Sequence, residues 1–241
     1  MQFNMAVKRI FLLSALISLI LILSTNAYGG GLSPEDKLFI VGAGAYEDKL
    51  WDVAALAFSR LLAEYPSSKK AEEVTHLLGV CYTQMKEYQP AIKVFMGFLE
   101  KYPKSSMYQI VLIRLGEVYL KLENPNEAVK IFQLISSLKD VDKNADAAIF
   151  TLGETYVKMG KYKEAAEEFI NFPQRFPESK FKNESYYWAG EALFNLENYK
   201  DAKNYYKKFY ELMPEHSLSD DALNGAAWCE YRSGALKPAL A

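Results

Sequence analysis

A repeat of 37 residues runs through most of this chain and constrains its fold more than any other feature. The marker of the repeat is a small residue, and the same interval separates every two successive markers. These markers are Gly42, Gly79, Gly116, Gly153, Gly190 and Ala227. Because a fixed period of roughly 20 to 50 residues indicates stacked copies of one supersecondary unit, the sequence predicts a repeat architecture.

Two further positions of the repeat favour a pair of antiparallel helices. An alanine stands twelve residues after each marker, and an aromatic residue stands four residues after each of the first five alanines. The alanines are Ala54, Ala91, Ala128, Ala165, Ala202 and Ala239, and the aromatic residues are Phe58, Phe95, Phe132, Phe169 and Tyr206. Small residues let two helix axes approach to about 8–10 Å. Since residues four apart share a helix face, we expect the aromatic ring to fill the groove between one repeat and the next.

Proline residues mark the expected end of the second helix. Eight residues after the aromatic position stand Pro66, Pro103, Pro177 and Pro214, and Asp140 takes this place in the third repeat. Proline cannot continue the hydrogen-bond ladder of a helix and biases the preceding residue away from helical geometry. Pro173 lies inside the expected second helix of the fourth repeat, so we expect it to kink or shorten that helix.

Three repeats also carry Leu-Gly-x-x-Tyr, with the tyrosines at Tyr82, Tyr119 and Tyr156. At these positions the chain resembles the tetratricopeptide repeat (TPR) family, whose pattern is L-G-x2-Y, then A-x3-F, then P. The resemblance covers residues 33–241 and implies an all-α fold. It would be an α-solenoid, a right-handed superhelix of about five full repeats and a partial sixth. The family period is 34, so we expect the three additional residues of each repeat near the proline, as in residues 65–70.

The first 29 residues resemble a secretory signal. Lys8 and Arg9 precede an uncharged apolar run, Ile10 to Leu23, and small polar residues follow it. The run is shorter than the roughly 20 residues that span a bilayer, which favours a cleaved signal and a periplasmic protein over an inner-membrane anchor. Cleavage after Ala27 and cleavage after Gly29 both fit, and an uncleaved anchor remains the alternative. No cysteine lies near this region, so we expect no lipid anchor.

Composition argues against several classes of function. The formal net charge is −2, and no dense cluster of Lys and Arg is present, so we expect no nucleic-acid partner. No known catalytic or metal-binding motif is found, so we expect no enzyme activity, no cofactor, no metal and no small-molecule substrate. Cys81 and Cys229 occupy the same position of their repeats, among small residues, so we expect buried free thiols. Four repeats separate them, too far for a disulfide.

The candidate site is the concave surface, which in this family is lined mainly by the first helix of each repeat. The expected partner-binding residues are Arg114, Glu117, Phe150, Glu154, Tyr187, Trp188, Glu191, Phe194, Trp228 and Tyr231. The three glutamates recur one repeat apart and form either an acidic ladder for a basic partner or ordinary helical pairs with Lys121 and Lys158. The aromatic residues either line a peptide groove or belong to the core.

Segments such as Phe176-Pro177-Glu178-Ser179 and Tyr199-Lys200-Asp201-Ala202 resemble bacterial envelope TPR proteins. They are similar to the TPR domain of the Tol-Pal-associated cell-division coordinator and to the TPR lipoprotein of the outer-membrane β-barrel assembly machine. The resemblance implies a non-enzymatic periplasmic scaffold that binds envelope proteins or peptides. The alternatives are the regulatory arm of a larger cell-wall enzyme and a membrane-tethered secretion or assembly factor. The incomplete sixth repeat also suggests self-association.

Overall fold

The computed structural model describes residues 31–138 and 141–234. The predicted signal (residues 1–29), Asp140 and Ala239 lie outside the described residues. Within the described residues every regular element is helical, which confirms the all-α prediction. No helix in this part of the chain is both long enough and apolar enough to cross a membrane.

Eleven α-helices and one 3₁₀ turn follow each other along the described chain. They are α2 (Pro34–Glu47), α3 (Trp51–Glu64), α4 (Ala71–Gln84), α5 (Tyr88–Lys101), α6 (Tyr108–Lys121), α7 (Pro125–Ser136), η1 (Lys143–Ala145), α8 (Asp146–Lys158), α9 (Tyr162–Arg175), α10 (Glu184–Asn195), α11 (Tyr199–Leu212) and α12 (Ser219–Arg232). The even-numbered helices, which carry the markers, are called A helices here, and the odd-numbered helices are called B helices.

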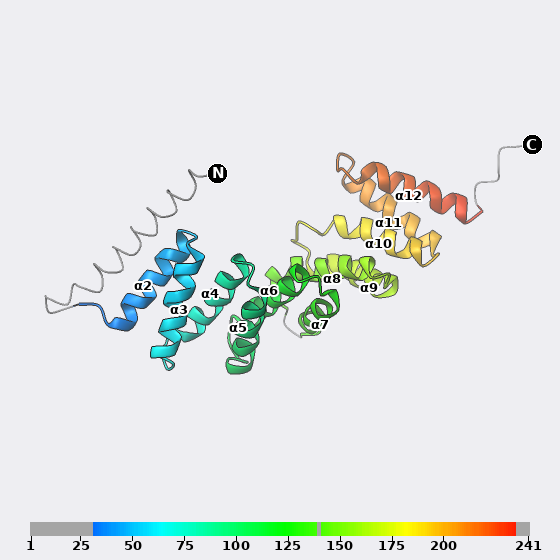
Figure 1. The fold of residues 1–241 in the computed structure, drawn as a ribbon. Helices are drawn as coiled ribbons and strands as arrows, with labels where there is room; N and C mark the ends of the chain where they lie inside the picture. Colours follow the sequence, from blue (N-terminus) through cyan, green and yellow to red (C-terminus); the bar gives the residue numbers. More distant parts are fainter. Residues whose placement is uncertain (1–30, 139–140, 235–241) are drawn as a thin grey trace, which may run out of the picture. The chain divides into compact units, whose positions relative to one another are not determined.

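The described residues form two compact units, which divide between Val118 and Tyr119. In the first unit α2, α3, α4 and α5 pack in succession as antiparallel neighbours (Figure 1). In the second unit α7 to α12 do the same. A helices also contact the next A helix, as in α2 with α4, α8 with α10, and α10 with α12. Consecutive antiparallel pairs with adjacent A helices are the arrangement of a TPR-like solenoid.

In four repeats the aromatic ring of the B helix lies directly on the glycine marker of its A helix. A Cβ atom added at Gly79 would stand 2.3 Å from a ring carbon of Phe95, and one added at Gly190 would stand 2.8 Å from Tyr206. Tyr206 also lies against Gly225 of α12, where an added Cβ would be 2.7 Å away. The ring therefore fills the space between its own repeat and the next, which confirms the prediction.

The turn from an A helix to its B helix has only three residues and contains a left-handed residue at the same place in each repeat. These residues are Lys49, Lys86, Glu123, Gly160 and Glu197, with φ between 56° and 70°. The connection from a B helix to the next A helix is longer, for example residues 65–70 and 102–107. The long connections therefore contain the proline, where the additional residues of each repeat were predicted.

A serine two residues after the proline position organises these long connections. Its hydroxyl oxygen accepts the backbone N–H two residues on, at 3.0 Å for Ser68, 2.8 Å for Ser105 and 3.1 Å for Ser179. The same hydroxyl donates to a carboxylate in the first turn of the preceding A helix. The pairs are Ser68 with Glu35, Ser105 with Glu72, and Ser179 with Asp146. Each connection is thus hydrogen-bonded to its own repeat.

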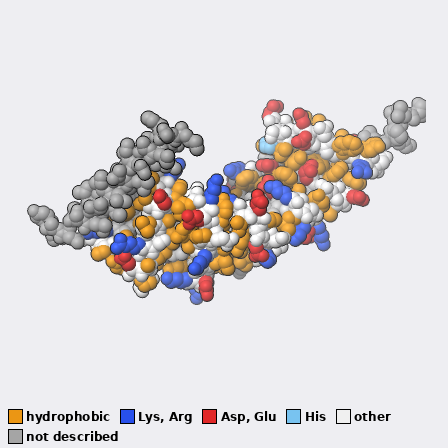
Figure 2. All heavy atoms as spheres, viewed as in Figure 1, with side chains coloured by type: hydrophobic (Ala, Val, Ile, Leu, Met, Phe, Trp, Pro, Cys, Tyr) orange, Lys and Arg blue, Asp and Glu red, His pale blue; other side chains and the backbone are white. Residues whose placement is uncertain are grey.

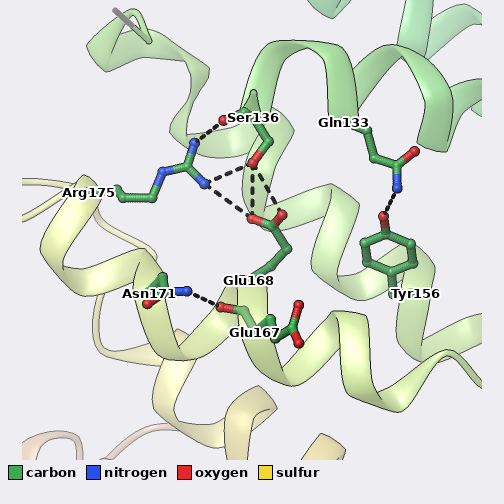
Figure 3. A network of polar contacts seen from close by, with 7 residues as sticks. All are labelled: Gln133, Ser136, Tyr156, Glu167, Glu168, Asn171 and Arg175. Atoms are coloured by element: carbon green, nitrogen blue, oxygen red, sulfur yellow. Dashed lines mark hydrogen bonds and ion pairs between the residues drawn. The ribbon is translucent and has the colours of Figure 1, made fainter. Parts of the chain in front are cut away.

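The third repeat of the pattern lacks the proline and uses a different contact in the second unit (Figure 3). The Arg175 guanidinium on α9 donates to the backbone carbonyl of Ser136 at 3.1 Å, in the last turn of α7, and pairs with Glu168 at 3.2 Å. The Ser136 hydroxyl lies between them, 2.9 Å from Arg175 Nη1 and 3.2 Å from Glu168 Oε1. Since the last carbonyls of a helix have no intrahelical partner, Arg175 caps α7.

Of the two effects expected for Pro173, a kinked or a shortened helix, the structure shows that the helix is not shortened. Helix α9 has 14 residues, as many as α3, α5 and α11. Pro173 lies in the last turn, so only its own missing N–H is lost from the ladder before the helix ends at Arg175.

Candidate protein-binding surface

Three adjacent A helices of the second unit carry the richest set of candidate residues. On α10 Glu184, Trp188 and Glu191 follow one another at intervals of four and three, so they share one helix face. On α12 Asp221 and Trp228 share a face in the same way. Glu154 on α8 stands one repeat before Glu191, and Glu184 stands one repeat before Asp221. Because α8 and α12 both contact α10, these residues form one continuous surface, called the A-face here.

The acidic residues of the A-face act on one another across neighbouring helices. Burial raises the pKa of Glu154, the nearby Lys158 partly offsets this effect, and the negative charge of Glu184 adds to it. Burial also raises the pKa of Tyr187, and the charges of Glu191 and Asp221 act on it in the same direction. Glu154 and Glu184 thus form one acidic pair across α8 and α10, and Glu191 and Asp221, which both act on Tyr187, stand at the equivalent places one repeat on and are called the second acidic pair.

Glu191 is also held from within the core. The hydroxyl of the buried Tyr206 donates a hydrogen bond to Glu191 Oε1 at 2.8 Å. Tyr206 takes the place of the phenylalanine found at this position in the preceding repeats, and only tyrosine can supply this donor. The Tyr187 hydroxyl interacts with the same carboxylate, so two tyrosines of the core position Glu191 at the edge of the A-face.

Trp188 lies between the two acidic residues of α10. Its ring stacks on Phe169 with a centroid distance of 6.2 Å and an interplanar angle of 19°, and it meets Tyr187 edge-on. The indole Nε1 is buried, and among the described residues no acceptor reaches it. Trp188 is only partly buried as a whole, so part of its ring belongs to the A-face.

Helix α12 presents the exposed end of the A-face. Trp228 is 57% exposed and Tyr231 is 62% exposed, and their rings meet edge-on at 5.7 Å. Together with Asn224 and Ala227 they line a shallow hollow. Figure 2 shows hydrophobic atoms at the surface over this part of the second unit. Large exposed aromatic residues that adjoin each other are characteristic of interaction surfaces.

Two residues of α12 are more exposed than their equivalents in the preceding repeats. Leu223 is exposed, although the equivalent Ile149 and Tyr186 are buried. Ala227 is exposed as well, whereas the equivalent Gly190 is covered by an aromatic ring of the following B helix.

The structure corrects the predicted site at two residues. Phe150 is 4% exposed and stacks on Phe181 at 4.7 Å, and Tyr187 is 8% exposed and packs against Tyr206 and Phe209. Both belong to the core, because this position of the A helix faces the B helix of its own repeat. We therefore remove them from the partner-binding set.

The remaining predicted residues divide between the two units. Arg114 and Glu117 lie on α6 in the first unit and pair with each other at 2.9 Å. In the second unit Phe194 is partly buried against Tyr199, with ring centroids 5.5 Å apart. Glu154, Trp188, Glu191 and Trp228 belong to the A-face, and Tyr231 adjoins it through its contact with Trp228. Whether any of these residues binds a partner remains a prediction.

Two acidic residues of the A-face were missed by the sequence analysis. Glu184 and Asp221 stand in the first turns of α10 and α12, where acidic residues commonly favour the helix dipole. The signal that could have found them is the 37-residue spacing between them, combined with the contact expected between neighbouring A helices.

Cysteine and histidine offer no reactive or metal-binding group in the described part of the chain. Cys81 and Cys229 are buried, and burial raises their pKa to about 12 and about 11, respectively. A thiol with such a pKa stays protonated at neutral pH and is a poor nucleophile. Residues 31–138 and 141–234 contain no group of three or more His, Cys, Asp or Glu that could hold a metal ion.

Comparison with known proteins agrees with this architecture. Tetratricopeptide repeat models match residues 76–105, 111–141, 147–179 and 183–216, which together make up more than half of the chain. The chain belongs to the tetratricopeptide repeat family. No curated protein sequence matches it significantly.

Solved structures share the fold at low sequence identity. YrrB, described as a TPR protein with an unusual peptide-binding site, has a TM-score of 0.60 and 20% identity over 78% of this chain and 91% of its own. MamA has a TM-score of 0.61 and 20% identity over 75% of this chain and 92% of its own. A TPR protein from Parabacteroides merdae has a TM-score of 0.61 and 14% identity over 83% of this chain and 73% of its own. These likenesses show the fold, and the resemblance to two envelope families stays a prediction.

Proposed function

We propose that this protein is a non-enzymatic scaffold that binds a segment of another protein along the A-face of its second unit. The observation that carries the proposal is the exposed pair Trp228 and Tyr231, which continues into Trp188 and the acidic residues of α8, α10 and α12. Tryptophan and tyrosine are enriched among the residues that dominate binding energy. A TPR protein of similar fold, YrrB, is described as having a peptide-binding site, which supports this kind of function.

The proposed setting is the bacterial periplasm, where the scaffold would bind envelope proteins or peptides. The proposal is supported by the N-terminal basic and apolar segment and by the resemblance to envelope TPR proteins described above. Mass spectrometry of the protein from a periplasmic extract tests it. A mature start after Ala27 or Gly29 is the expected result. A full-length protein in the cytosolic fraction would contradict the setting but leave the binding function standing.

Photocrosslinking in living cells tests the binding function itself. A photoreactive residue replaces Ala227, which is exposed in the hollow beside Trp228, and a second variant carries it at the exposed Lys163 on the B helix α9. We expect a distinct partner to be crosslinked from position 227 and not from position 163. Equal crosslinking from both positions, or from neither, would refute the A-face as the binding surface. Crosslinks only to a second copy of this chain would replace partner binding with self-association.

A further inference from the structure

The two acidic pairs of the A-face repeat with the period of the fold. Glu154 on α8 and Glu184 on α10 lie on contacting helices, close enough for the charge of Glu184 to act on Glu154, and Glu191 on α10 and Asp221 on α12 stand at the equivalent places of the next two helices. Like charges at such places oppose each other and cost stability in the free protein. On this surface Lys158 is the cation that acts on Glu154. The equivalent position in the next repeat is Asn195, which carries no charge.

Aromatic rings accompany the acidic pairs and make the surface suitable for cations with an apolar stem. Trp188 lies on the same face of α10 as Glu184 and Glu191. Trp228 lies on the same face of α12 as Asp221. A Lys or Arg side chain can pack its methylene groups against an indole ring and place its charge near both the ring face and a carboxylate.

We infer that the partner of the A-face is a basic, extended peptide segment with Lys or Arg residues three positions apart. This inference rests on the proposed function and names the chemical class of the partner. Charge complementarity selects a basic segment, because two acidic pairs flank the aromatic residues. The spacing follows from the fold. Neighbouring helices lie about 8–10 Å apart, and a chain in the polyproline II conformation rises about 3.1 Å per residue with three residues per turn, so residues three positions apart lie on the same side of the peptide and span one repeat.

The test is a selection from a phage-displayed library of random 12-residue peptides against the purified full chain. We expect the bound peptides to be enriched several-fold in Lys and Arg over the starting library, with a preferred spacing of three. Bound peptides without such enrichment would refute the basic partner but support the peptide-binding function. A library from which no peptide is enriched would refute both.

Charge reversal shows whether the A-face is responsible. The test variant carries Glu154→Lys and Glu184→Lys, and the control carries Glu164→Lys and Glu211→Lys at exposed places on the B helices α9 and α11. Both variants change the net charge equally. The test variant should lose the basic preference, whereas the control should retain it. An unchanged preference in the test variant, or an equal loss in the control, would refute the inference.

A milder variant covers the case in which charge reversal prevents folding. Glu154→Gln and Glu184→Gln keep the size of both side chains, and circular dichroism checks that the helices are intact. The affinity for a selected basic peptide should fall about tenfold or more, and the affinity of the unaltered chain should fall steeply between low and high salt. Affinities that change neither with these substitutions nor with salt would refute the inference.

Discussion

At the scale of single residues, the contact between a glycine marker and an aromatic ring explains why the repeat tolerates so little variation at the marker. An added Cβ at Gly79 would stand 2.3 Å from a ring carbon of the fully buried Phe95, much closer than van der Waals contact. The ring cannot move away without disturbing its own packing. The short distance between the two helices therefore limits the size of the residue at the marker. The sequence pattern reveals the marker because the glycine and the aromatic residue recur together.

Gly79→Ala is therefore expected to destabilise the protein by about 1–3 kcal/mol, as overpacked cores usually do. Gly97→Ala is the matched control. It lies on α5 in the same unit, is exposed, and has no atom within 4 Å of an added Cβ. It should stabilise the protein by about 0.5–1 kcal/mol because alanine is the better helix former. Urea unfolding followed by circular dichroism measures both. Equal effects of the two substitutions would contradict this account.

His76 gives the first unit a pH dependence. Burial lowers the pKa of His76, and the positive charge of Arg114 acts in the same direction. The folded protein therefore binds fewer protons than the unfolded chain just below pH 6.5, and stability falls as the pH drops through this range. We expect His76→Leu to lose less stability than the unaltered protein between pH 7 and pH 5.5. Thermal unfolding at both pH values measures the difference, and parallel losses would contradict the prediction.

At the scale of helices, the sequence predicted the elements well because each repeat carries both a helix signal and a stop signal. The alanine and aromatic positions define the B helices, and the proline positions mark the long connections in every repeat but one. The left-handed residues at 49, 86, 123, 160 and 197 could not be found in this way. Lys, Glu and Gly share no side-chain chemistry there, and the tight three-residue turn between packed helices imposes the positive φ.

The candidate site, like the helices, was predicted only in part. Trp188, Trp228 and the glutamates were found because the position within the A helix decides which side chains can reach the surface. Phe150 and Tyr187 were assigned wrongly to the groove. Their helix position is equivalent to that of Asn224, which is exposed and lines a hollow, whereas Phe150 packs against rings of α9 and Tyr187 against rings of α11. The packing of the rings, which the sequence pattern does not reveal, decides the difference.

The contacts of Arg175, which join α9 to the end of α7 in the second unit, lead to a prediction about stability. Arg175→Ala should destabilise the protein by about 1–3 kcal/mol, because it removes a cap from α7 and leaves Glu168 partly buried without its cation. Arg60→Ala is the control. Arg60 pairs with Glu64 on one exposed helix surface, and such pairs contribute little. Urea unfolding should therefore distinguish the two variants, and equal stabilities would show that the capping contact is unimportant.

At the scale of the whole molecule, the repeated acidic pairs lower the free energy of unfolding, although the fold does not require them. The core of each repeat is well packed, and its connections are hydrogen-bonded, so the fold does not depend on the charges of Glu154 or Glu184. Because burial and the charge of Glu184 both raise the pKa of Glu154, the folded state favours the protonated carboxyl more than the unfolded chain does. Stability from this group is therefore highest at low pH and falls as the pH rises through the folded pKa.

Glu154→Gln should for this reason raise the melting temperature of the free protein at pH 7 and lower its affinity for a basic peptide. A residue that serves only the fold would not show this opposition, because removing it would lower stability or leave both properties unchanged. A site kept for binding is expected to be strained in the absence of its partner. Thermal unfolding and peptide titration of the same variant measure the two effects together. A variant that is more stable and binds equally well would show that the acidic pair has no role in recognition.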